Sequence, residues 1–180
     1  IRRHGFRKIL LQNGGEMKLK QIKLTQNRVA LVDDKDFKRL CHFKWRAKQE
    51  YKNCYAVRYS HTINGKDIIV AMHREILNAS NGIFVDHKNG NGLDNRRNNL
   101  RICTHQQNHY NRKLPHTNNK LGIKGISWDN RAKKFRSQIQ VNKRKIHLGY
   151  FNILGDGDSA YRIAEEKYFG EFARNYENKN

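Results

Sequence analysis

The sequence predicts an α+β chain of short antiparallel hairpins, a few short helices and one longer helix near its carboxyl end. Two observations support this class. Apolar and polar residues alternate in several short segments that are separated by Asn-Gly and similar turns. Residues 154–169 instead carry apolar residues at helical spacing. Between these regions, residues 85–100 are rich in Gly and Asn and are expected to form a loop.

The first elements are predicted to be a hairpin and a short helix. Residues 18–32 alternate on either side of Gln26-Asn27, which is typical of a turn. Asp33 and Asp34 are expected to cap a helix that runs to Cys41, with both acids at its positive end.

A second hairpin and a second short helix follow. Residues 55–59 and 67–71 flank Asn64-Gly65, a strong hairpin signal. Residues 72–77 are predicted to be helical up to Asn78. After the loop, residues 101–103 are expected to form a brief strand and residues 104–112 a helix that Thr104 can cap.

The last third of the chain is predicted to be a three-stranded antiparallel sheet packed on one helix. Residues 125–128, 134–141 and 145–151 have strand character, with a turn at Lys143-Arg144. The helix over 154–169 presents Ala160, Ile163 and Ala164 at helical spacing. It leaves one sheet face free, and this face carries Arg136, Gln138, Gln140, Lys145 and His147.

Composition indicates a polyanionic partner. The chain has 180 residues, with 37 Lys and Arg against 16 acids, and a formal net charge of +21. No run of apolar residues approaches the length of a membrane span, so we expect no membrane contact and a location in the cytoplasm of a bacterial or phage-infected cell, or in an organelle. Three cysteines without a Cys-x-x-Cys pair exclude a disulfide framework and a cysteine-rich zinc site.

The loop region brings together residues that suit phosphodiester hydrolysis. His87 is the natural general base, because an imidazole is neutral near physiological pH. Asp86 on the opposite side of an extended backbone can bind a divalent cation, and Asn108 can add an amide oxygen. Oxygen ligands of this kind favour Mg²⁺ or Mn²⁺. Asn99 is expected to bond the loop backbone and orient the base.

These residues and their spacing resemble the HNH endonuclease motif, in the His-Asn-Asn form of phage and intron-encoded homing endonucleases. The resemblance covers residues 72–112, with thirteen positions from Asp86 to Asn99 and nine more to Asn108. It implies a ββα-metal fold with one divalent cation. It also implies that Asp86 and Asn108 are metal ligands, that His87 is the base, and that Asn99 positions it. Asn108 stands where many members of the family have a histidine. His73, at the start of the motif, is a possible accessory residue.

The carboxyl-terminal third is similar to the Apetala-two, or ethylene-response-factor, DNA-binding domain. The resemblance rests on Gly125-Ile126-Ser127-Trp128, His147-Leu148-Gly149-Tyr150-Phe151 and Phe169-Gly170-Glu171-Phe172-Ala173. It covers residues 121–175 and implies that the three-stranded sheet lies in the major groove of DNA. Ser127, Gln138 and Gln140 occupy positions where the family has base-reading arginines, so the target sequence differs.

Five segments are therefore expected along the chain. They are residues 1–16 (an extension or basic arm before Met17), 17–71 (β-rich), 72–112 (the HNH-like core), 113–120 (a basic linker) and 121–175 (the Apetala-two-like domain). No acid occurs between Arg96 and Trp128, so this stretch is expected to follow phosphates. The expected DNA contacts are Arg96, Arg97, Arg101, Arg112, Lys113, Ser127, Arg131, Arg136, Gln138, Gln140, Lys145 and His147.

The function that best accounts for these features is a site-directed, metal-dependent DNA endonuclease of homing or mobile-element type. Its partner is double-stranded DNA and not a small molecule. One site per chain favours a monomer that nicks one strand, whereas a dimer would cut both. The alternatives are a DNA-binding regulator without catalysis, and an RNA-binding protein, which would explain the charge but not the ligand set.

Overall fold

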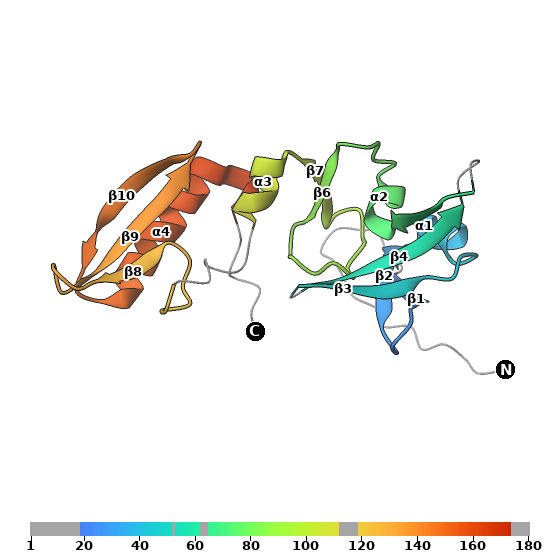
Figure 1. Cartoon of the computed structure of the whole chain (residues 1–180), viewed down its shortest axis with the longest axis horizontal. Coiled ribbons are helices and arrows are strands. Elements are labelled where there is room, and N and C mark those ends of the chain that lie inside the picture. Colours follow the sequence, from blue (N-terminus) through green and yellow to red (C-terminus); the bar gives the residue numbers. More distant parts are fainter. Residues whose placement is uncertain (1–18, 52, 62–64, 112–118, 174–180) are drawn as a thin grey trace, which may run out of the picture. The chain divides into compact units, whose positions relative to one another are not determined.

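A computed structural model describes residues 19–51, 53–61, 65–111 and 119–173 (Figure 1). Its contacts divide the chain into two compact units, the first ending at Thr104 and the second beginning at His105. The predicted segment 1–16, most of the predicted linker, and the predicted DNA contacts Arg112 and Lys113 lie outside the described residues. The described part is α+β, as predicted.

The first unit begins with the predicted hairpin and short helix. Strands β1 (Leu19–Lys23) and β2 (Val29–Asp33) pair antiparallel, and α1 (Asp34–Leu40) follows at once. The turn falls at Gln26 and Asn27, whose φ angles are 60° and 53°. Asp33 precedes α1, but its side chain does not cap the helix. That prediction is wrong because the carboxylate instead accepts a hydrogen bond from the backbone N–H of Arg97, at 2.8 Å.

Two further sheets complete the first unit. Strands β3 (Arg46–Glu50), β4 (Asn53–His61) and β5 (Asp67–Ala71) form an antiparallel sheet in the order β3-β4-β5. The antiparallel pairing of β4 with β5 agrees with the predicted hairpin, although Asn64 of the predicted turn lies outside the described residues. Strand β3 was not predicted. After α2 (Met72–Ile76), strands β6 (Phe84–His87) and β7 (Leu100–Cys103) form a two-stranded sheet.

The core of the first unit lies between these sheets and the two helices. Val32 of β2, Leu40 of α1, Ala56 of β4 and Met72 of α2 are completely buried. Removing this apolar surface from water is what holds the short elements together, since helices of one or two turns are unstable alone.

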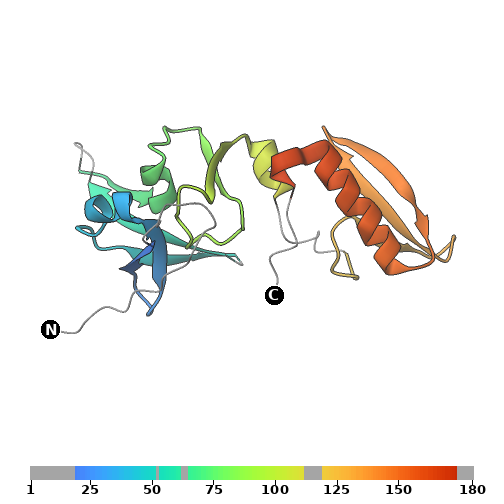
Figure 2. The same cartoon turned by 180° about the vertical axis from the view of Figure 1, so that it is seen from behind.

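The second unit is the predicted helix-backed sheet. Strands β8 (Ile126–Asp129), β9 (Lys134–Val141) and β10 (Arg144–Phe151) pair antiparallel in the order β10-β9-β8. Helix α4 (Leu154–Phe169) has the predicted bounds and lies along one face of the sheet (Figures 1 and 2). The core comprises Ile139 from β9 and Tyr161, Ala164 and Phe169. The unit also contains α3 (His105–Tyr110) and a 3₁₀ turn over Gly170–Phe172.

Two details of the second unit differ from the prediction. The β9–β10 turn falls at Asn142 and Lys143, with φ angles of 49° and 65°, so that Arg144 already belongs to β10. Ile163 is 69% exposed, because Tyr161, Ala164 and Glu165 form the buried side of α4.

No helix within the described ranges is long and apolar enough to cross a membrane. The three cysteines are free thiols, of which Cys54 and Cys103 are buried.

Candidate active site and nucleic-acid interface

The end of β6 places Asp86 and His87 next to each other, and both side chains are buried. In the β6–β7 pair, Asp86 lies opposite Arg101 and His87 opposite Leu100. Because successive residues of a strand face opposite sides, the carboxylate and the imidazole have different neighbours.

The neighbour of Asp86 is Arg101. Its Nε and Nη2 atoms donate to Oδ2 of Asp86 at 2.9 and 2.6 Å, and both side chains are less than a tenth exposed. Two charges buried this deeply are stable only as a pair. Arg101 was predicted to contact DNA. In the structure its guanidinium holds the Asp86 carboxylate in position, and a contact with DNA stays a prediction.

The neighbour of His87 is Asn95, which is fully buried. Nε2 of His87 lies 3.4 Å from Oδ1 of Asn95, while Nδ2 of Asn95 donates to the carbonyl of Gly92. That second bond fixes the amide with its oxygen toward the imidazole. The contact therefore favours the tautomer in which Nε2 carries the proton and Nδ1 carries the lone pair.

The rings of Tyr55, His73 and His87 contact one another at this site. The His87 ring lies 5.0 Å from that of His73 on α2 and 5.9 Å from that of Tyr55 on β4. Within the described residues, Nδ1 of His73 is buried without a hydrogen-bond partner. His73 thus lies where the sequence suggested an accessory residue, in direct contact with the predicted base.

Burial keeps both imidazoles uncharged. It lowers the pKa of His73 to about 3, with further lowering from His87 and Arg74. Burial also lowers the pKa of His87, although Asn95 and the charges of Asp86 and Asp94 oppose the shift. A neutral imidazole near pH 7 is the protonation state that a general base requires.

Asn99 organises the loop that follows His87. Its Oδ1 accepts from the backbone N–H of Asn89, and its Nδ2 donates to Oδ1 of Asn89 and to the carbonyl of Asp94. These three hydrogen bonds, 2.7–3.0 Å long, join the two ends of the loop. Asn99 thus bonds the loop backbone as predicted, while the side chain that reaches His87 is Asn95.

Residues outside the loop also clamp it. Asn53 of β4 accepts from the N–H of Gly92 and donates to the carbonyl of Gly90. Leu31 of β2 exchanges backbone hydrogen bonds with Leu93 and Asn95 at 2.8 Å. A Cβ on Gly92 would lie 2.5 Å from the carbonyl oxygen of Cys54, so only glycine fits there.

The other predicted DNA contacts of this loop, Arg96 and Arg97, also bind carboxylates. Arg96 donates two hydrogen bonds to the Asp94 carboxylate, at 2.6 and 2.7 Å. Arg97 donates two to the carboxylate of Asp36 of α1, at 2.7 and 2.8 Å. Burial opposes ionisation of Asp36, but the arginine hydrogen bonds outweigh it and keep the pKa of this carboxyl below its usual range. Contacts from Arg96 and Arg97 to phosphate would compete with these pairs and stay predictions.

The donor types suit a hard cation. Within the described residues, no group of three or more His, Cys, Asp or Glu side chains could hold a metal ion. The site that the sequence predicts, with one carboxylate and one amide oxygen, is of a different kind, and it stays a prediction. Asn108, the predicted second ligand, is exposed on α3 in the second unit, whereas Asn111 is buried.

The second unit has the predicted polar sheet face. The strand register places Ser127 beside Arg136, Gln138 beside His147 and Gln140 beside Lys145. Within the described residues, Oγ of Ser127 and Nε of Arg136 are buried and have no hydrogen-bond partner. Arg131 lies exposed in the β8–β9 turn. The strand residues among these donors share the face that α4 does not cover.

Sequence reasoning missed Asn95, Asp94, Asn53 and Tyr55. Asp94 and Asn95 lie inside the loop, where they are indistinguishable from ordinary turn residues. Asn53 and Tyr55 are more than thirty positions from His87, and no local pattern connects them with it.

A family model described as HNH endonuclease matches residues 70–110. The chain is 29% identical over 107 residues to Protein 3.8 of Escherichia phage T7, an alignment that covers 57% of this chain and 87% of that protein. It is 37% identical over 93 residues to a protein of Acanthamoeba polyphaga mimivirus described as an uncharacterised HNH endonuclease. That alignment covers 51% of this chain and 46% of the mimivirus protein, so the chain spans less than half of that relative.

No solved structure matches the chain significantly. The family match coincides with α2, β6, the clamped loop, β7 and α3, the elements that carry His73, Asp86, His87, Asn99 and Asn108. Residues 70–110 are therefore an HNH endonuclease domain, and this match supports a DNA endonuclease activity.

Proposed function

We propose that this endonuclease is site-directed, depends on a divalent metal ion and nicks one DNA strand per active site, as homing and mobile-element enzymes do. The observation that carries the proposal is the environment of His87. A buried, neutral imidazole is held by Asn95 beside the carboxylate of Asp86.

In the proposed reaction, His87 accepts a proton from the attacking water through Nδ1, while Asn95 holds Nε2–H. General bases of this kind contribute about 100- to 10,000-fold to the rate. Asp86 and Asn108 would hold Mg²⁺ or Mn²⁺, which would neutralise the charge that develops on the phosphate. The strand would be left with a 3′-hydroxyl and a 5′-phosphate.

We further propose that the second unit reads DNA in the manner of an Apetala-two domain, acting as a monomer with the nuclease domain. The support is the row of amides, guanidinium and imidazole on the uncovered sheet face, since amide and guanidinium groups suit base edges. The ββα-metal arrangement of β6, β7 and α3 is part of the same proposal.

The test uses a library of supercoiled plasmids with random inserts, incubated with the full chain and Mg²⁺, with and without a chelator. Nicked molecules are sequenced on both strands to obtain the site and the ends. We expect a single-strand break at a preferred sequence that the chelator abolishes.

Three variants complete the test. His87→Ala should lose cleavage by at least 100-fold and still bind DNA. Asn95→Ala should lose about 10- to 100-fold, the usual cost of an orienting contact. His42→Ala, which alters an exposed histidine of the same unit, is the control and should cleave normally. Cleavage by His87→Ala at the wild-type rate would contradict the mechanism. Cleavage by the wild-type chain in the presence of chelator would also contradict it.

A further inference from the structure

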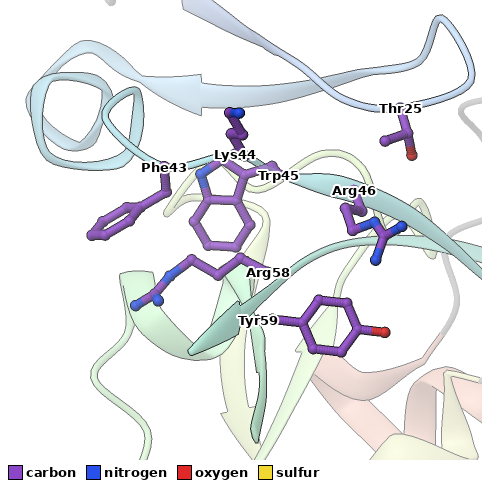
Figure 3. Close-up of a pocket in the computed structure, with 7 residues that line it drawn as sticks. All are labelled: Thr25, Phe43, Lys44, Trp45, Arg46, Arg58 and Tyr59. Atoms are coloured by element: carbon purple, nitrogen blue, oxygen red, sulfur yellow. The ribbon is translucent and has the colours of Figure 1, made fainter. Parts of the chain in front are cut away.

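A cleft of about 370 Å³ opens at the start of edge strand β3, outside the HNH domain (Figure 3). Its lining contains three cations, three aromatic rings and one threonine, and no carboxylate. The lining residues are Thr25, Phe43, Lys44, Trp45, Arg46, Arg58 and Tyr59.

The two sides of the cleft differ in their charge. Arg58 is stacked 4.1 Å from the Phe43 ring and donates to Glu75 at 3.0 Å, so its charge is already neutralised. Arg46 lies 5.3 Å over the ring of Tyr59, and Figure 3 shows the two side by side. Within the described part of the chain, neither Lys44 nor Arg46 pairs with a carboxylate. Both are exposed, and Tyr59 is 52% exposed.

The cleft is connected to the active site through β4. Tyr55 and Tyr59 lie on the same face of this strand, because they are four residues apart and side chains alternate. Tyr55 contacts the ring of His87. Four residues of strand span about 13 Å, which corresponds to about four base pairs of B-form DNA.

We propose that this cleft binds the DNA substrate beside the cut, with a backbone phosphate on Lys44 and Arg46 and the adjoining sugar or base against Tyr59. The inference rests on the proposed function, because its ligand is the strand that His87 attacks. Two unpaired cations next to a half-exposed tyrosine ring match a phosphate followed by an apolar sugar or base. The site lies about four base pairs from the broken bond. Binding there would fix the position of the nuclease domain along the DNA.

The test measures DNA binding at several salt concentrations, in the His87→Ala chain so that the DNA stays intact. Each phosphate contact contributes about 0.9 to the slope of log K against log salt concentration. Because Lys44 and Arg46 are proposed to hold one phosphate together, Lys44→Ala with Arg46→Ala should reduce the slope by about 0.9. The matched control is Lys35→Ala with Lys38→Ala, which removes the same charge from exposed positions of α1 and should change the slope little.

A photo-crosslinking residue at position 59 gives an independent readout in the cleaving chain. It should react with DNA about four nucleotides from the nick, whereas the same residue at the exposed position of Tyr51 should react less. An unchanged slope, an equal change in the control pair, or no crosslink from position 59 would overturn the inference. Normal cleavage with an unchanged slope would reject the cleft alone, while absence of cleavage by the wild-type chain would reject the proposed function.

Discussion

His73 has an unusual position for a histidine, because it is buried with Nδ1 unpartnered among the described residues. Its pKa is lowered to about 3, from an ordinary value of 6.5. The folded state therefore binds fewer protons than the unfolded state between these two values. Stability contributed by the neutral ring is complete above about pH 6.5 and is lost as the pH falls toward 3.

We expect the free energy of unfolding of the first unit to fall by up to about 1.4 kcal/mol per pH unit below pH 6.5. His73→Phe should weaken this dependence, since a phenyl ring keeps the contacts with Tyr55 and His87 and cannot titrate. The measurement is urea unfolding followed by Trp45 fluorescence in a Trp128→Phe background, kept above about pH 4.5, where most carboxylates stay ionised. An equally steep dependence in His73→Phe would assign the effect to His87 or to other groups.

At the scale of elements, a partly buried ion pair links α3 to α4 in the second unit. Nζ of Lys124 donates to Oε1 of Glu165 at 2.6 Å and to the carbonyl of Tyr110 at 2.7 Å. The rings of Tyr110 and Phe169 are stacked 3.8 Å apart. Burial raises the pKa of Glu165, although Lys124 opposes the shift. The helix that carries Asn108 is therefore fastened to α4 and not only to the chain beside it.

Lys124→Met should destabilise the second unit by about 3–5 kcal/mol, because it leaves the buried Glu165 carboxylate without its counter-ion. The loss should be smaller at low pH, where that carboxyl takes up a proton. Lys124→Met with Glu165→Leu should restore most of the stability, since an apolar pair of similar volume needs no partner. Urea unfolding followed by the helical circular dichroism signal measures both, and a double variant as unstable as the single one would show that the pair is not the cause.

The elements that the sequence predicted well are those determined by local pattern. Helix α4 and the hairpins follow from periodicity and from turn residues such as Gln26-Asn27. Strand β3 was missed because Arg-Ala-Lys-Gln-Glu is a charged edge strand that only its pairing with β4 defines.

In the site, Asp86 and His87 were evident from residue type and spacing. The roles of Asn95 and Arg101 were not, because they depend on which side chains a folded loop brings within 3.4 Å.

At the scale of the whole molecule, cutting and reading are proposed to belong to different units, so they should be separable by mutation. Arg136→Ala with Gln138→Ala should keep Mg²⁺-dependent nicking but spread it over more sequences, since each base contact contributes about 1–3 kcal/mol of discrimination. Sequencing nicked plasmids from the random library gives this distribution. Arg162→Ala, on an exposed position of α4, is the control and should keep the wild-type preference. Unchanged site preference in the double variant would place sequence reading elsewhere.

The glycine at position 92 limits how the nuclease domain can be moved between proteins. The family pattern spans residues 70–110, yet the loop inside it rests on Asn53 and the Cys54 carbonyl of β4, and on Leu31 of β2. A graft of the matched segment alone would leave these supports behind and release the loop that carries Asn95. The segment that must be transferred is therefore longer than the family motif. A chimaera should contain the whole chain from β1 to α3.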